Sequence, residues 1–192
     1  MKVVAISVFA FVAMTLASCR PAAAPVSVSE KPVSINERRT TNAPLPPSKP
    51  FSEMSWASPD EKVQKLSDLA GKAVILDFWA TYCEPCKREI PHLNSLIAKY
   101  GKDNLKIVGL NVGGDEDAPK IPAFVASTKI DYEIAFPEDA LVNFIFSERS
   151  DIPQTAVFDR KGKLVRKIVG FSDRIQNELD DAVETALSDL PR

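Results

Sequence analysis

The chain has 192 residues, of which 45% are hydrophobic and 26% are charged, as expected for one globular domain with extensions. Its formal net charge of -2 gives no electrostatic basis for binding nucleic acid or an anionic membrane surface. Of its three cysteines, two stand close together in sequence, so no second pair remains for a structural disulfide.

The N-terminal residues have the pattern of a secretory signal. Lys2 is followed by the uncharged stretch Val3–Leu16, which as a helix would be about 21 Å long, short of a hydrocarbon core of about 30 Å. The sequence LASC, ending at Cys19, resembles the lipobox of bacterial lipoproteins, in which cleavage precedes a cysteine that then carries the lipid. The resemblance predicts a signal peptide over 1–18 and a lipidated Cys19. An ordinary cleaved signal or an uncleaved anchor, each with a chance cysteine, are the alternatives.

All three interpretations place the domain outside the cytoplasm, in the periplasm or on the outer face of the cytoplasmic membrane. Residues 20–50 include seven prolines, with alanine and serine between them and almost no periodic apolar pattern. We therefore expect a flexible tether over 19–50, membrane attachment through Cys19, and a folded domain over 51–192.

The first elements of the domain lead to a pair of cysteines. Met54–Ala57 fits a first strand and Lys65–Leu69 a short helical turn, and the apolar run Ala73–Phe78 (AVILDF) predicts a buried central strand. After Cys83, apolar residues recur at three- and four-residue spacing as far as Tyr100, which predicts a helix that ends before glycine.

Cys83 therefore lies at a helix N-terminus, where free amide groups and the helix dipole stabilise a thiolate. Cys86 is three residues further on and shares its face, so Cys83 could attack a foreign disulfide and Cys86 could resolve the mixed disulfide. Pro85 suits the first helical turn, where a missing N–H costs nothing. Two structural thiols, or half of a zinc site, are the alternative.

The segment FWATYCEPC, residues 78–86, resembles the active site of the thioredoxin superfamily, and CEPCKREIP, residues 83–91, is most similar to its TlpA/ResA-type thiol-disulfide oxidoreductases. The resemblance covers roughly residues 53–190. It implies an α/β thioredoxin-like fold, a central mixed sheet flanked by helices, with a TlpA-type insertion over 115–150. We expect no cofactor and no metal.

The remaining elements agree with such a fold. Periodicity and turn residues predict a buried strand parallel to the first, a helix, a short strand, a second helix, a hairpin and a final amphipathic helix. In order these are Lys106–Val112, Ala118–Thr128, Ile134–Phe136, Asp139–Phe146, the strands Thr155–Asp159 and Leu164–Val169, and a helix marked by Ile175, Leu179, Val183 and Leu187.

Pro153 precedes a strand, where a trans peptide bond is the usual state. Its position matches the cis-proline of the superfamily, and the resemblance implies a cis bond after Ile152, with the Ile152 backbone free to pair with substrate. The family more often has Gly at the position of Asp151 and Thr at the position of Gln154. These two differences affect the expected substrate contacts and not the expected cis bond.

Two acidic residues are expected to tune the chemistry. Asp77 stands in an otherwise apolar strand, where burial would raise its pKa and suit it to accept a proton from the resolving thiol; a strand-edge Asp facing solvent is the alternative. Thioredoxins have a buried acid at this position, whereas many TlpA-type proteins have Asn. The charge of Glu84 opposes a thiolate at Cys83 and favours a reductant, unless the residue is exposed and without influence.

Trp79 and Tyr82 flank the cysteines and could form an apolar rim for a polypeptide substrate; otherwise Trp79 packs in the core and Tyr82 is merely exposed. His92 is the only histidine, and we expect it at the surface rather than as a ligand.

The leading hypothesis is a membrane-tethered, monomeric reductase of disulfides in other extracytoplasmic proteins. The family resemblance suggests a membrane thiol as electron donor and a role in cytochrome c maturation. A disulfide oxidase or isomerase, a peroxiredoxin-like peroxidase and a copper chaperone with paired thiolates are the alternatives. Zinc would need more ligands than the chain offers.

Overall fold

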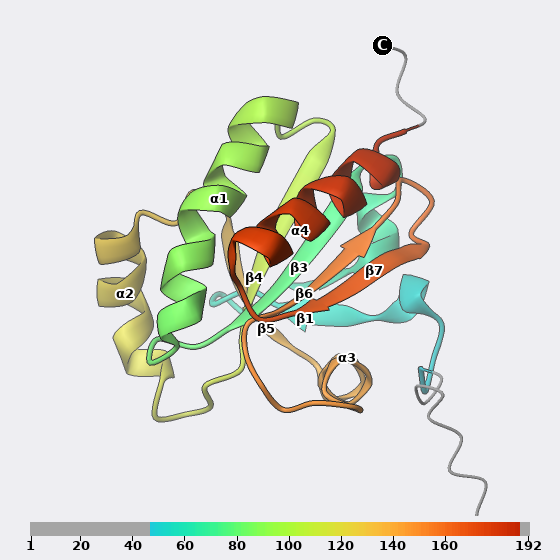
Figure 1. Cartoon of the computed structure of the whole chain (residues 1–192). Coiled ribbons are helices and arrows are strands. Elements are labelled where there is room, and N and C mark those ends of the chain that lie inside the picture. The colour runs from blue at the N-terminus through green and yellow to red at the C-terminus, as the bar shows by residue number, and fades with distance from the viewer. Residues whose placement is uncertain (1–46, 189–192) are drawn as a thin grey trace, which may run out of the picture. The chain divides into compact units, whose positions relative to one another are not determined.

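The computed structural model describes residues 47–188, and within them seven strands form one mixed sheet in the order β2-β1-β5-β4-β3-β6-β7 (Figure 1). The strands are β1 (Ser55–Ala57), β2 (Val63–Lys65), β3 (Ala73–Trp79), β4 (Leu105–Asn111), β5 (Glu133–Pro137), β6 (Gln154–Phe158) and β7 (Leu164–Val169). The helices are α1 (Glu84–Tyr100), α2 (Ile121–Thr128), α3 (Asp139–Ile145) and α4 (Asp173–Ala186), with short 3-10 turns at Phe51–Glu53, Leu66–Leu69 and Ala118–Lys120.

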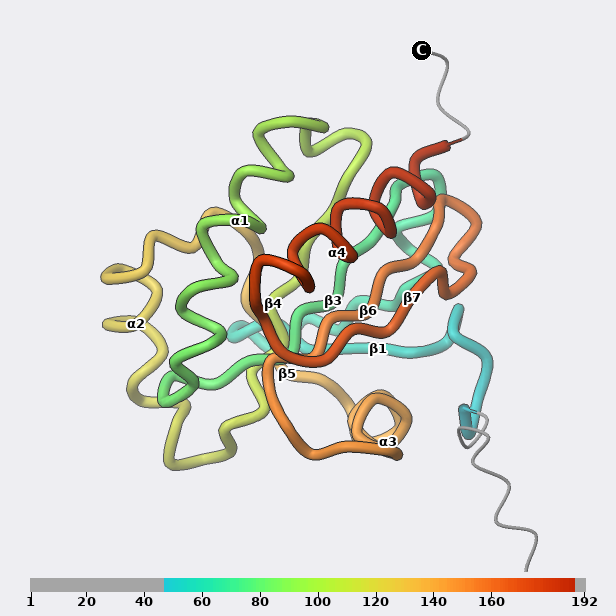
Figure 2. Tube along the Cα trace, in the orientation of Figure 1, coloured from blue at the N-terminus to red at the C-terminus, as the bar shows by residue number. Residues whose placement is uncertain are grey.

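Strand β3 lies near the middle of the sheet, as its sequence, apolar except for Asp77, predicts (Figure 2). It pairs in parallel with β4 on one side and antiparallel with β6 on the other. Strand β5 continues the parallel part beside β4, and β1 and β7 add antiparallel pairs toward the two edges. The active-site segment therefore follows a strand in which every residue is buried.

The two faces of the sheet are covered by different helices. Because side chains alternate along a strand, Ala73 and Ile75 of β3 pack with α1 and α4, whereas Leu76 and Phe78 pack with α3 on the opposite face. Figure 1 shows α1 and α4 together in front of the sheet. Asp77 shares the alternation of Ala73 and Ile75, so its carboxyl lies on the face that α1 covers.

Most elements expected from the sequence are confirmed, with ends that differ from the predicted ones by at most three residues. The edge strand β2 was not predicted: it is three residues long and exposes Val63, so it has no alternating apolar pattern. The predicted turn at Lys65–Leu69 begins one residue later, because Lys65 belongs to β2.

The predicted signal peptide, the lipidated Cys19 and most of the predicted tether lie outside the described residues. Lys49, at the end of that tether, forms an ion pair with Glu138 next to α3. Between residues 47 and 188, no helix has both the length and the hydrophobicity needed to cross a bilayer.

Candidate active site

Cys83 and Cys86 form a disulfide at the start of α1, with their Cα atoms 5.3 Å apart. Cys83 is the N-cap residue, and its sulfur accepts a hydrogen bond from the backbone N–H of Cys86 at 3.2 Å. Pro85 is in the first turn, as predicted. Cys83 is 5% exposed and Cys86 is 1% exposed, so Cys83 is the sulfur that an incoming group reaches more easily.

The peptide bond between Ile152 and Pro153 is cis, as predicted. Ile152 packs against the cluster of side chains that contains both cysteines, which brings this loop beside the disulfide even though it is distant in sequence. The backbone of Pro153 is held in place because its carbonyl accepts a hydrogen bond from the N–H of Gly170 at 2.8 Å.

Asp77 is 2% exposed, so the alternative of a solvent-facing residue is wrong. Burial raises the pKa of Asp77 to about 7, and a hydrogen bond from the Tyr132 hydroxyl to Oδ2, at 3.2 Å, opposes that rise. The other oxygen, Oδ1, is buried and has no partner among the described residues. The predicted rise in pKa is confirmed, and the carboxyl can take up and release a proton near neutral pH.

A second buried carboxyl, that of Glu89 on α1, interacts with Asp77. Burial raises the pKa of Glu89 well above its ordinary value, and repulsion from Asp77 raises it further. The Thr155 hydroxyl donates to Glu89 Oε1 at 2.8 Å, whereas Oε2 is buried without a partner in the described structure. Two carboxylates in one apolar site strongly disfavour double ionisation, so the pair keeps a proton near neutral pH.

Glu84 is on the outside of the site. Its side chain is 71% exposed and forms an ion pair with Lys87 one turn further along α1. Solvent and the neighbouring ammonium screen its charge, so its effect on Cys83 is smaller than that of a buried carboxylate.

Comparison with known proteins connects this geometry to a family. The model of the AhpC/TSA family matches residues 47–167, well over half of the chain. The chain belongs to the AhpC/TSA family.

Two curated relatives of this AhpC/TSA family member are named thiol-disulfide oxidoreductases. The chain is 32% identical over 114 residues to the thiol-disulfide oxidoreductase ResA of Bacillus cereus, covering 59% of this chain and 64% of the relative. It is 33% identical over 106 residues to ResA of Bacillus subtilis, covering 55% and 58%. The match therefore spans less than two thirds of these curated relatives.

A solved structure with the same fold is the thiol:disulfide interchange protein, a thioredoxin family protein, from Chlorobium tepidum. It has a TM-score of 0.59 and 25% identity, covering 73% of this chain and 98% of that one. The thioredoxin-like fold predicted from the sequence is confirmed.

The two aromatic residues beside the cysteines of this AhpC/TSA domain have different environments. Tyr82 is 66% exposed and remains a candidate for substrate contact. Trp79 is fully buried and stacks on Phe124 of α2, with ring centroids 4.8 Å apart. The prediction that Trp79 contributes to a substrate rim is therefore wrong; it faces the α1 side of β3, where α2 covers it.

His92 is partly buried. Its side chain is 11% exposed and lies between α1 and α4, with Nε2 2.9 Å from Asp180 Oδ1 and its ring beside Phe171. The expected surface position therefore holds only in part, because α4, distant in sequence, covers most of this side chain. No group of three or more His, Cys, Asp or Glu side chains in residues 47–188 is arranged to hold a metal ion.

Sequence reasoning missed Glu89, Thr155 and Tyr132. Glu89 could have been found, because it follows Cys86 by three residues and so shares its face of α1. Thr155 and Tyr132 have no comparable sequence signal, because each comes close to the acidic residues only when the distant segments of the sheet assemble.

Proposed function

We propose that this chain is a thiol-disulfide oxidoreductase that reduces disulfides in extracytoplasmic proteins. The observation that carries the proposal is the Cys83–Cys86 disulfide at the N-terminus of α1, where an amide N–H already points at the Cys83 sulfur. The names of the ResA relatives and of the Chlorobium neighbour support the same chemistry.

The reaction begins from the dithiol. The Cys83 thiolate attacks one sulfur of the substrate disulfide, and the departing substrate sulfur takes a proton. Cys86 then gives its proton to Asp77 and attacks Cys83, which closes the enzyme disulfide and releases the second substrate thiol. Two electrons pass to the substrate, and an external dithiol must return the enzyme to its reduced form.

The reducing direction is supported by the charges around the cysteines. The buried Asp77–Glu89 pair keeps one proton and so carries about one negative charge near neutral pH, and Glu84 adds a smaller, screened contribution. Negative charge disfavours a thiolate and hence the reduced enzyme. An enzyme whose reduced form is disfavoured gives its electrons away. Exposed Tyr82 and the backbone of Ile152, beside Pro153, are the substrate contacts that we propose.

The cellular setting belongs to the same proposal. The lipobox-like segment supports attachment through Cys19 to a membrane, with the domain in the periplasm or on the outer face of the cytoplasmic membrane and a membrane thiol as electron donor. The proposed monomeric state and the proposed role in cytochrome c maturation are supported only by the resemblance to ResA-type proteins.

The test is the reduction potential of the Cys83–Cys86 pair, measured with the full chain in dithiothreitol buffers at pH 7, together with the rate of insulin disulfide reduction. We expect a potential near that of thioredoxin, about -270 mV, and insulin reduction that is lost in Cys83→Ser. A potential near -120 mV would reverse the direction and make the protein a donor of disulfides.

The same preparation tests the alternatives. Turnover of hydrogen peroxide that survives Cys86→Ser would indicate a peroxidase. Stoichiometric binding of Cu(I) by the reduced chain, without insulin reduction, would indicate a copper carrier.

A further inference from the structure

Tyr132 reaches the buried acid of the proposed reaction from a distant part of the chain. It directly precedes β5, and its hydroxyl donates to Asp77 Oδ2 at 3.2 Å. It is the hydrogen-bond donor to a carboxyl whose other oxygen, among the described residues, has no partner. The position of the Asp77 carboxyl therefore depends on this phenol.

The ring reaches Asp77 because β4 has no side chain in its path. Gly109 is the residue of β4 directly opposite Asp77 in the parallel register. A Cβ atom at Gly109 would lie 2.9 Å from Cε2 of Tyr132 and 2.9 Å from Nε1 of Trp79, closer than such atoms approach in proteins. The glycine thus leaves the space that the ring of Tyr132 occupies.

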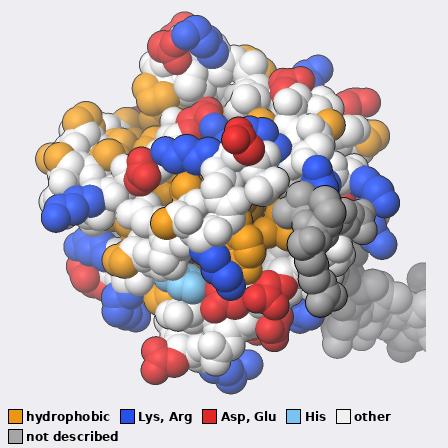
Figure 3. All heavy atoms as spheres, turned by 90° about the horizontal axis from the view of Figure 1, so that it is seen from above, with side chains coloured by type: hydrophobic (Ala, Val, Ile, Leu, Met, Phe, Trp, Pro, Cys, Tyr) orange, Lys and Arg blue, Asp and Glu red, His pale blue; other side chains and the backbone are white. Residues whose placement is uncertain are grey.

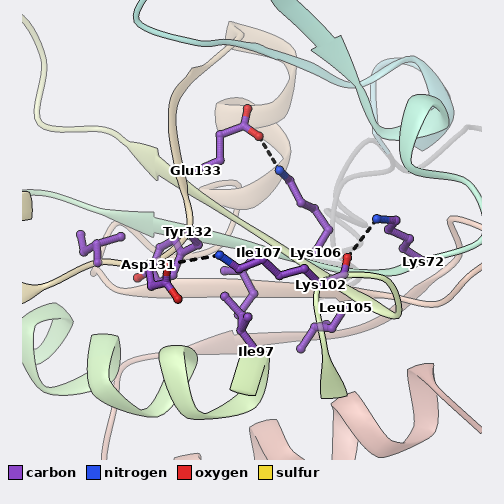
Figure 4. A pocket seen from close by; sticks show the side chains of 10 residues that line it. Lys72, Ile97, Lys102, Leu105, Lys106, Ile107, Asp131, Tyr132 and Glu133 are labelled. Carbon is purple, nitrogen blue, oxygen red and sulfur yellow. Dashed lines mark hydrogen bonds and ion pairs between the residues drawn. The ribbon is translucent and has the colours of Figure 1, made fainter. Parts of the chain in front are cut away.

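Tyr132 also lines a cavity of about 440 Å³ between the end of α1 and strand β4 (Figure 4). The rim of the cavity is polar: Lys102 is paired with Asp131, and Lys106 with Glu133. Ile97 and Ile107 contribute apolar wall. One aromatic ring therefore borders a solvent-accessible cavity and carries the hydroxyl that bonds to the buried acid.

We propose that Tyr132 is a positioning residue for the disulfide chemistry, whose hydroxyl holds the Asp77 carboxyl and whose ring seals it from solvent in the cavity. The inference rests on the proposed function, because it concerns the acid that takes the proton of Cys86. Neither the family match nor the CEPC segment points to this residue.

The two parts of the side chain act on Asp77 in opposite senses. The hydroxyl stabilises the carboxylate and lowers the pKa of Asp77, whereas exclusion of water raises it. In the disulfide form, the titratable groups that act on Asp77 are Glu89 from α1 and Tyr132 itself; β4 and β6 present Gly109 and Thr155, which do not titrate. In the reduced form the Cys86 thiol of the proposed reaction joins them.

This opposition allows a test with two variants of the full chain. Tyr132→Phe keeps the ring and removes the hydroxyl, while Tyr132→Ala removes both. Tyr100→Phe is the matched control, because its hydroxyl contacts exposed Glu184, away from the cysteines. The rate of insulin disulfide reduction is measured from pH 5 to 9 for each protein.

The rate should fall at low pH as Asp77 becomes protonated. In Tyr132→Phe this acidic limb should move to higher pH by roughly one unit, because the carboxylate loses a charge-assisted hydrogen bond. In Tyr132→Ala it should move to lower pH, because water reaches the carboxyl from the cavity. Tyr100→Phe should match the unchanged protein.

The proposal would be overturned if the acidic limb of the pH–rate profile stayed in place in Tyr132→Phe. It would also be overturned if the limb moved in the same direction in both variants. If Tyr132→Ala does not fold, Tyr132→Leu takes its place. Titration of the Asp77 carboxyl by carbon-13 NMR in the oxidised protein gives the same comparison without turnover. If the unchanged chain reduces no disulfide, the proposed function fails, and the titration still decides whether Tyr132 controls Asp77.

Discussion

The buried carboxyls of Asp77 and Glu89 are the residues least expected in the core of a stable domain. Each accepts one hydrogen bond, from Tyr132 and Thr155 respectively, and each keeps one buried oxygen without a partner in the described structure. Burying a polar group without a partner costs free energy, and burying a charge costs more. Such a pair is expected where proton transfer requires it, because packing alone would favour apolar residues.

The unfolding free energy should depend on Asp77 and on pH. Its pKa is about 7 in the folded protein and near 3.8 in the unfolded chain, so the folded state binds more protons between these values. Stability should fall as pH rises from about 4 to 7, by up to roughly 4 kcal/mol. In Asp77→Asn that decline should shrink, leaving the variant more stable than the unchanged protein at pH 8.

Urea denaturation at pH 5 and pH 8 measures how the unfolding free energy of each protein changes with pH. Asp103→Asn, at an exposed position, is the control and should follow the unchanged protein at both pH values. Parallel curves for Asp77→Asn and the unchanged protein would contradict the assignment of the decline to Asp77.

The order of the two cysteines should be visible in trapping experiments. Because Cys83 is the more accessible sulfur, reduced Cys86→Ser should form a lasting mixed disulfide with an insulin chain, detected by mass spectrometry under non-reducing conditions. Cys83→Ser should trap little, since Cys86 is buried. More adduct with Cys83→Ser than with Cys86→Ser would reverse the order.

Among the elements, the loop between β4 and α2 holds the active-site loop in place. Buried Asp117 in that loop accepts hydrogen bonds from the Thr81 N–H at 3.0 Å, from the Thr81 hydroxyl, and from Asn111 Nδ2 at 2.8 Å. Burial raises the pKa of Asp117, but these hydrogen bonds outweigh it, and the net pKa is lowered. The carboxyl ends of parallel β3 and β4 are thereby joined beside the cysteines.

Removal of this connection should loosen the loop that carries Tyr82 and Cys83. Asp117→Ala leaves the partly buried donors of Thr81 and the buried amide of Asn111 without their acceptor, which we expect to lower the unfolding free energy by about 1–3 kcal/mol. Asp115→Ala, in the same loop but exposed, should change it by less than about 0.5 kcal/mol. Equal effects of the two variants in urea denaturation would show that the bonds of Asp117 contribute nothing.

How far the sequence reveals an element depends on whether its signal is local. Strand β3 and helices α1 and α4 have continuous or periodic apolar patterns, and the cysteine pair is a contiguous motif, so these were predictable. The cis bond at Pro153 followed from position within a recognised family. Contacts between segments that are distant in sequence could not be predicted. Tyr132 contacts Asp77 because Gly109 leaves space for its ring, and α4 covers most of the His92 side chain.

At the scale of the whole molecule, the sheet separates two large apolar cores, and a third, smaller cluster surrounds the cysteines. Alternate residues of β3 enter the core under α1 and α4 and the core that includes α3. Leu141 of α3 is buried against the second core, although it belongs to the segment predicted as an insertion. On the face in Figure 3, acidic and basic side chains are interspersed, in keeping with the net charge of -2.

The described domain should therefore unfold as one unit. Leu141→Ala, in the core beside α3, and Leu93→Ala, in the core beneath α1, should each lower the unfolding free energy by about 2–5 kcal/mol. Circular dichroism and tryptophan fluorescence should give coincident urea transitions for both. Separate transitions for Leu141→Ala would mean that α3 is stabilised independently of the rest.

The disulfide also joins the redox chemistry to folding through a thermodynamic cycle. The difference in unfolding free energy between the oxidised and reduced proteins equals the difference in the free energy of reducing the Cys83–Cys86 pair in the folded and unfolded chains. For two electrons, 30 mV corresponds to about 1.4 kcal/mol. If the folded pair is a stronger reductant than the unfolded one, the oxidised protein must withstand more urea than the reduced protein. Two denaturation curves thus show whether folding makes the Cys83–Cys86 pair a stronger or a weaker reductant than the same pair in the unfolded chain.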